Sequence, residues 1–177
     1  MLKAIVGFVV GAAAVYLLVP PAGDTEKVSN LSDSPVYLEN LAVVKAFQNA
    51  IINEDIETLA TMVSDTVKYN SSAYGSTVGT KEDWTGRLQE WFDNFEDFAI
   101  EEVVFLPGLD GVTAEPDGSV RLYIHWNYTH SSGVKVDPWR YANFDFEGGK
   151  IVAALIFGDS GGMMNHIAQA AATSESE

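Results

Sequence analysis

The 177-residue sequence contains no cysteine, so disulfide bonds, thiolate catalysis and cysteine-ligated zinc are all excluded. It is also poor in positive charge, because 10 lysine and arginine residues stand against 25 aspartate and glutamate residues, for a formal net charge of −15. A protein that binds nucleic acid needs a basic surface to contact the phosphate backbone. We therefore predict no nucleic-acid partner. The same acidity disfavours tight docking on anionic lipid headgroups.

A single long uncharged apolar run, Ala4 to Val19, follows Lys3 and ends at Pro20. As a helix it would span about 24 Å, close to the ~30 Å hydrocarbon core of a bilayer. Three interpretations are open: an uncleaved signal anchor, which we favour, a cleaved signal peptide, and a buried core helix. Lys3 places the N-terminus inside by the positive-inside rule. We predict membrane attachment through residues 4–19, with the domain on the periplasmic or extracellular side, or a secreted protein if residues 1–22 are removed.

The remaining chain divides by composition. Residues 23–35 are polar and rich in turn-forming residues, which predicts a linker. Residues 36–170 carry periodic hydrophobic patterns and are expected to form one folded domain, since a hydrophobic content of 47% suffices for a core. Residues 171–177 are small, polar and acidic, and predict a flexible tail.

The first part of this domain has helical periodicity. Apolar residues recur at three- and four-residue steps from Leu38 to Ile51, and a shorter helix is expected over residues 56–63. A short strand over residues 65–70 follows. A third helix should begin after Thr80, a suitable N-cap, with Asp83 at the acidic position of a capping box. Its apolar stripe consists of Trp84, Leu88, Trp91, Phe92 and Phe95.

After Asp97 the pattern changes to a period of two, which predicts strands joined by hairpin-length connections and an α+β fold. A tight turn is expected at residues 116–118. The expected strands cover residues 100–106, 120–130, 139–146 and 151–157. In the second, Leu122, Ile124, Trp126 and Tyr128 share one face, and Tyr123, His125, Asn127 and Thr129 share the other. The last is apolar at both parities, so we expect it in the middle of the sheet with both faces covered.

The order of these elements and the closing motif resemble the nuclear transport factor 2-like superfamily, especially its SnoaL-like branch. The motif is the turn and strand Gly149-Lys150-Ile151-Val152, then Phe157 and Asp159 before a last helix. The resemblance covers residues 38–168. It implies a cone-shaped fold in which a curved antiparallel sheet wraps over about three helices and encloses a pocket, here preceded by the N-terminal apolar helix. It also implies a homodimer formed through the sheet.

On the layout of that family, a set of aromatic residues is expected to contribute to the pocket lining and to bind a small apolar or amphipathic molecule. The set consists of Tyr69, Trp84, Trp91, Trp126, Tyr128, Phe144 and Phe157. Isomerase-like members carry a catalytic acid where this chain has Tyr69 and Asn70, and many SnoaL-like members carry Glu where it has Ala153. These departures favour a pocket without the chemistry of those members.

Two residues remain candidates for catalysis. Asp159 could act as a general acid or base, or could cap the last helix. His125 could carry a proton near neutral pH, or could face solvent or a dimer partner. The three histidines lack metal-ligand spacing and no phosphate-binding glycine loop is present, so we predict no metal and no cofactor.

Three functions stay open at this point. We favour a non-catalytic ligand-binding domain. The first alternative is an enzyme of lyase, isomerase or hydrolase type that uses Asp159, assisted by His125 or Tyr69. The second is a structural domain that binds a partner or a second copy through the outer sheet face.

Overall fold

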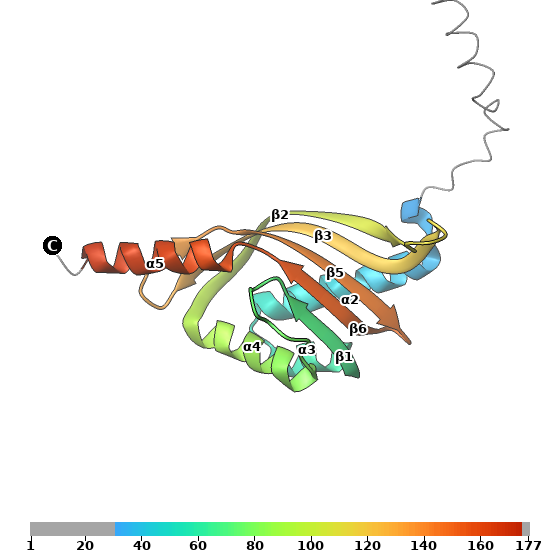
Figure 1. Cartoon of the computed structure of the whole chain (residues 1–177), viewed down its shortest axis with the longest axis horizontal. Coiled ribbons are helices and arrows are strands. Elements are labelled where there is room, and N and C mark those ends of the chain that lie inside the picture. Colours follow the sequence, from blue (N-terminus) through green and yellow to red (C-terminus); the bar gives the residue numbers. More distant parts are fainter. Residues whose placement is uncertain (1–30, 175–177) are drawn as a thin grey trace, which may run out of the picture. The chain divides into compact units, whose positions relative to one another are not determined.

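The computed structural model describes residues 31–174, which form a mixed α+β fold with one curved sheet (Figure 1). The predicted signal anchor, the apolar helix within it and the linker up to residue 30 lie outside the described residues. Between residues 31 and 174, no helix has both the length and the apolar character that a membrane crossing requires.

The predicted helices are confirmed, and the first α-helix begins at a proline, whose fixed φ suits the first turn. The last helix runs four residues into the segment that was predicted as a flexible tail. The helical elements are the 3₁₀ turn η1 (Leu31–Asp33), α2 (Pro35–Ile52), α3 (Ile56–Met62), α4 (Lys81–Asn94) and α5 (Ser160–Ser174).

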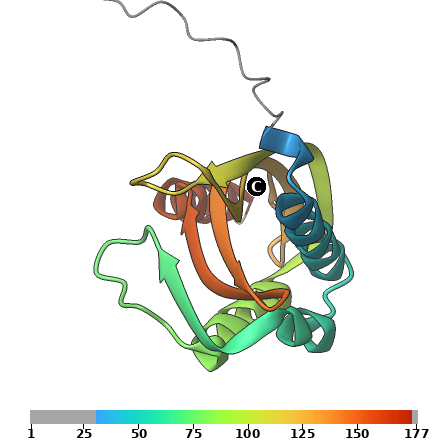
Figure 2. The ribbon, with the colours of Figure 1, turned by 90° about the vertical axis from the view of Figure 1, so that its right-hand side faces the viewer.

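The strands form one six-stranded sheet in the order β1-β6-β5-β3-β2, with the short β4 paired to β3. The first strand pairs in parallel with the last, and all other pairings are antiparallel. Figure 2 shows that the sheet is strongly curved, with α2, α3 and α4 on its concave side. The strands are β1 (Val63–Ser71), β2 (Phe95–Leu109), β3 (Pro116–His130), β4 (Lys135–Val136), β5 (Trp139–Glu147) and β6 (Lys150–Phe157).

Three sequence-based boundaries were wrong. The strand expected to begin at residue 100 begins at Phe95, which had been predicted on the apolar stripe of the third helix. The tight turn expected at residues 116–118 belongs to β3, and the connection instead spans residues 110–115. There the Asp110 carboxylate accepts the backbone N–H groups of Val112 and Thr113, which makes a side-chain turn. In addition, β2 continues through Pro107, because β2 is the edge of the sheet and a missing N–H is tolerated there.

The alternation of β3 correctly separates the two faces of the sheet. Leu122, Ile124, Trp126 and Tyr128 are all buried on the inner face, whereas Tyr123 is 47% exposed on the outer face. β6 lies in the middle of the sheet as expected, between β1 and β5. Its two faces are not both covered, however, because Phe157 is 45% exposed. The described residues provide no second layer over the outer face.

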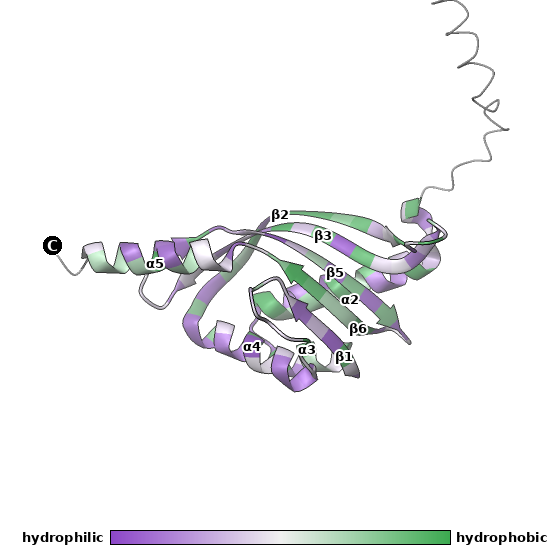
Figure 3. Cartoon of the chain, viewed as in Figure 1, coloured by the Kyte–Doolittle hydropathy of each residue, from purple (hydrophilic) through white to green (hydrophobic). Residues whose placement is uncertain are grey.

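The hydrophobic core fills the concave side of the sheet. Val44 of α2, Leu59 of α3 and Val120 of β3 are fully buried in it. In Figure 3, β6 is largely hydrophobic and the visible face of α4 is largely hydrophilic, as the amphipathic pattern of α4 predicts. The core therefore fixes α2 and α4 against the sheet. The candidate functional site lies between these two helices and the concave face of the sheet.

Candidate functional site

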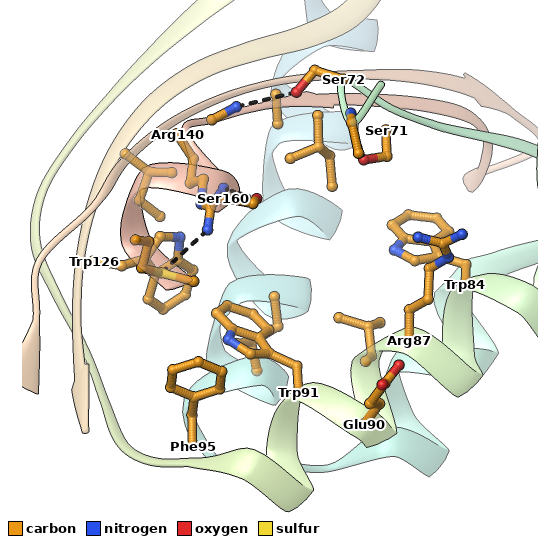
Figure 4. A pocket seen from close by; sticks show the side chains of 18 of the residues that line it. Ser71, Ser72, Trp84, Arg87, Glu90, Trp91, Phe95, Trp126, Arg140 and Ser160 are labelled. Atoms are coloured by element: carbon orange, nitrogen blue, oxygen red, sulfur yellow. Dashed lines mark hydrogen bonds between the residues drawn. The ribbon is translucent and has the colours of Figure 1, made fainter. Parts of the chain in front are cut away.

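A cavity of about 520 Å³ lies between the concave face of the sheet and helices α2 and α4, with the start of α5 at its edge (Figure 4). We call it the central cavity. Most of the described residues that line it are apolar or aromatic, as in sites for small organic ligands. Its apolar lining includes Tyr69, Trp84, Leu88, Trp91, Trp126 and Phe144.

Aromatic rings hold one another in place along this wall. The ring of Trp84 stacks on that of Tyr69, with 5.2 Å between the centroids and 4° between the planes. The ring centroid of Phe47 lies 5.4 Å from that of Trp84 and 5.8 Å from that of Phe144. Trp91 meets the ring of Trp126 edge-on at 6.1 Å. Such interlocked rings make a preformed apolar surface with little side-chain freedom left to lose on binding.

One cationic side chain, Arg140 of β5, enters this wall. Its Nη1 donates a hydrogen bond to Oγ of Ser160 at 2.9 Å, and its Nη2 lies 3.5 Å from the Tyr128 hydroxyl and 3.7 Å from Sδ of Met163. The guanidinium lies against Gly158, where an added Cβ would overlap it. The glycine that ends β6 therefore makes room for Arg140.

A second group of polar side chains lies along α4 and the loop after β1. Arg87 and Glu90 are exposed residues of α4 that line the central cavity, and the Arg87 guanidinium lies 5.9 Å from the centroid of the Tyr69 ring. Ser71 and Ser72 contribute hydroxyl groups from the opposite side (Figure 4). These residues define the rim of the central cavity. Gln48 of α2 adds an amide to the lining and is only 6% exposed.

Two tyrosines beside the Arg140 side chain keep their protons at neutral pH. Burial raises the pKa of Tyr69 above its usual value of 10.0, although the nearby charges of Arg87 and Arg140 act in the opposite direction. Burial likewise raises the pKa of Tyr128, against the effect of its hydrogen bond from Arg140. Both phenols are therefore neutral hydrogen-bonding groups and not phenolate bases.

The structure brings most of the predicted ligand-binding residues together. Tyr69, Trp84, Trp91, Trp126 and Phe144 all line the central cavity. Phe157 does not, because its side chain lies on the outer face, where its ring is 6.0 Å from that of Tyr141. Tyr128 is buried beside the lining, where its hydroxyl donates to Sδ of Met163, which does line the cavity.

The two predicted catalytic residues do not meet. Asp159 is exposed, and its carboxylate accepts the backbone N–H of Gly162 at 2.8 Å, which caps α5. His125 lies on the outer face, stacked on Trp139 at 4.8 Å, with Nε2 2.9 Å from the backbone oxygen of Asp137. Neither residue is part of the cavity lining, although Gly158 and Ser160 on either side of Asp159 are.

Sequence reasoning missed the polar residues of the site. Arg140, Arg87, Glu90, Gln48 and His130 all line the central cavity. Of these, only His130 had entered the sequence-based predictions, as one of three histidines without metal-ligand spacing. Within residues 31–174, no group of three histidine, aspartate or glutamate side chains is arranged to hold a metal ion.

The fold and the cavity define a class: this is the nuclear transport factor 2-like fold, with a curved sheet that closes a cavity over helices. One similar structure is an NTF2-like protein from Burkholderia xenovorans LB400, with 14% identity and a TM-score of 0.53 over 70% of this chain and 91% of that one. A second is the BvnE pinacolase from Penicillium brevicompactum, with 8% identity and a TM-score of 0.61 over 78% of this chain and 99% of that one. A third is a putative polyketide cyclase from Xanthomonas campestris, with 13% identity and a TM-score of 0.57 over 68% of this chain and 90% of that one. No family model matches the sequence, and no curated protein matches it. These likenesses confirm the expected fold.

Proposed function

We propose that this domain binds a small amphipathic molecule in the central cavity and does not use a carboxylate for acid–base catalysis there. The observation that carries the proposal is the combination of a preformed aromatic wall with few polar groups around about 520 Å³ of space. Apolar surface removed from water contributes roughly 25 cal/mol per Å², so a ligand tail among these rings gains affinity without further chemistry.

The non-catalytic part of the proposal is supported by the positions of the acids. Among the described lining residues, the one carboxylate belongs to Glu90, which is exposed on the rim. Asp159 is occupied as the cap of α5 and lies outside the lining. Two of the three neighbours named above carry enzyme names, a pinacolase and a putative polyketide cyclase. Because fold does not carry activity, the alternative of an Asp159-dependent enzyme has less support than binding.

The absence of cysteine allows a specific test, because a single introduced thiol is the only site for maleimide labelling. Ala73 lines the central cavity at its rim, so Ala73→Cys in the full-length protein reports access to the site. We expect 4-phenylbutyramide, a soluble amphipathic probe, to slow labelling of this thiol in a saturable way. Native mass spectrometry of the unmodified protein should detect any molecule that remains bound through purification.

The adjacent residue provides the control. Tyr74 is fully exposed and does not line the cavity, so the thiol of Tyr74→Cys should react at the same rate with and without the probe. Equal labelling of Ala73→Cys across a series of neutral and anionic amphiphiles would overturn the proposal. Attachment to a membrane through residues 4–19 and a location outside the cytoplasm remain predictions from the sequence.

A further inference from the structure

The Arg140 guanidinium has hydrogen-bonding capacity that its protein partners do not use. An arginine offers five N–H donors in a rigid fork. The bond to Ser160 at 2.9 Å uses one donor well, whereas the contacts of Nη2 with the Tyr128 hydroxyl and with Sδ of Met163 are long, at 3.5 and 3.7 Å. A thioether is also a weak acceptor. The remaining donors lie beside the central cavity, because Arg140 is one of its lining residues.

Arg140 also lacks a carboxylate partner among residues 31–174. The ion pairs found there join Lys81 to Asp65 and His125 to Asp137. This is unexpected in a chain whose acidic residues outnumber lysine and arginine by 25 to 10. A half-buried charge is costly unless an opposite charge and hydrogen bonds compensate for lost water. Glu90 is the one acid of the described lining, and Figure 4 shows it across the cavity, beside Arg87.

The local field of the site is therefore positive, although the whole chain is acidic. Two arginines, Arg140 and Arg87, stand against one carboxylate, that of Glu90, among the described lining residues. Salt screens the field of charges on the outer surface over about 8–10 Å, whereas it screens two charges in contact beside an apolar wall far less. A negative group that enters the cavity meets Arg140 at contact distance, where the distant acids have little effect.

We infer that the ligand of the central cavity is an amphipathic monocarboxylate whose carboxylate binds Arg140 and whose apolar part lies among Trp84, Trp91 and Trp126. This inference rests on the proposed binding function and names the ligand class for the same site. A carboxylate matches the planar fork of a guanidinium and accepts two parallel hydrogen bonds. One negative charge balances the half-buried guanidinium of Arg140, whereas the second charge of a dianionic phosphate would be left beside the apolar wall, because Arg87 is exposed on the rim. The hydrogen bond from Nη1 to Ser160 Oγ already holds the guanidinium in place.

The test compares 4-phenylbutyrate with 4-phenylbutyramide, which differ only in the charged headgroup, in the full-length Ala73→Cys protein. We expect the carboxylate to protect the thiol at a lower concentration than the amide. Adding Arg140→Gln should raise the concentration of carboxylate needed for half-protection about 10- to 100-fold, as expected for the loss of hydrogen bonds to a charged group. Protection by the amide should change much less than protection by the carboxylate, which shows that the cavity is intact.

Two further variants separate the outcomes. Arg140→Lys keeps the charge and should recover part of the lost carboxylate affinity, whereas Arg87→Gln removes an exposed rim charge and should change it less. If the carboxylate and the amide protect equally, and Arg140→Gln changes neither, the inference is wrong while the binding function stands. If neither compound protects the thiol, both the inference and the proposed function are overturned.

Discussion

Trp84 links the core to the candidate site, because a single ring serves both. It is 2% exposed, its centroid lies 5.4 Å from that of Phe47 and 6.4 Å from that of Phe144, and it also lines the central cavity. The stripe pattern of α4 correctly predicted that this residue would be buried. The same pattern could not tell core from cavity wall, because that distinction depends on how far the sheet stands from the helix.

Trp84→Ala is expected to destabilise the domain by about 3–5 kcal/mol, since a large buried aromatic is lost and a cavity is left behind. The free energy of unfolding in urea measures this change. Tyr74→Ala is the matched control, because Tyr74 is fully exposed and its loss should change stability by less than about 0.5 kcal/mol. Similar effects of the two substitutions would contradict the assignment of Trp84 to the core.

Side-chain parity explains which single residues were predictable. In β3 the alternation is clean, so Trp126 was correctly assigned to the inner face. β6 is apolar at both parities, so the sequence could not show that Ile156 would line the cavity and Phe157 would point outward. Arg140 had no signal at all, because its place in the wall depends on Gly158, which directly follows the neighbouring strand β6.

At the scale of elements, the local rules for helix starts worked best. Thr80 and Asp83 form the expected capping box: the Asp83 N–H donates to Thr80 Oγ1 at 3.3 Å and the Thr80 N–H donates to the Asp83 carboxylate at 2.8 Å. This success follows from the short range of the interaction, which lies within four consecutive residues. β1 shows the opposite case, because its parallel pairing with β6 joins segments about 80 residues apart and leaves no local pattern.

The capping box makes stability depend on pH through Asp83. The bond from the Thr80 backbone N–H holds the pKa of Asp83 below its usual value of 3.8. A lowered pKa in the folded state gives stability that is present above pH 3.8 and is lost as the pH falls through the folded pKa. Asp83→Asn should therefore lower the thermal midpoint at pH 7, and the difference from the parent protein should shrink as the pH falls below 3.8 and through the lowered pKa of Asp83. Glu82→Gln is the control, because it removes a charge from the same turn but leaves the capping box intact. A difference in thermal midpoint between Asp83→Asn and the parent protein that persists unchanged in acid would contradict the prediction.

The cap of α5 yields a separate prediction for Asp159. Asp159→Ala should destabilise the domain by about 0.5–2 kcal/mol, because the Gly162 N–H loses its acceptor, and Asp159→Ser should restore most of that loss. Urea unfolding measures both. Because Asp159 lies outside the cavity lining, protection of the Ala73→Cys thiol should be the same in both variants. Loss of protection without loss of stability would instead assign Asp159 to the site.

At the scale of the whole molecule, a row of apolar side chains crosses the outer face of the sheet. Val104, Tyr123, Tyr141 and Phe157 are direct cross-strand neighbours on β2, β3, β5 and β6. Val104 is 42%, Tyr123 47% and Phe157 45% exposed. The sequence correctly placed Tyr123 on the face opposite to Leu122 and Ile124. The apolar character of β6 had suggested cover on both sides, and the described residues cover only one.

An exposed apolar row of this kind is typical of an interface, so we propose that two copies of the chain pair through it. The full-length protein in density-matched detergent should then sediment as a dimer at micromolar concentration. Tyr123→Lys combined with Phe157→Lys should shift it to a monomer, because four like charges would meet across a two-fold axis. Both sites are nearly half exposed, so the fold itself should tolerate the change.

Val112→Lys is the control: this residue lies in the β2–β3 connection and is 94% exposed, so its substitution should leave the dimer intact. A parent protein that sediments as a monomer would show that this row serves something other than self-association, and a lysine variant that remains a dimer would place the interface elsewhere.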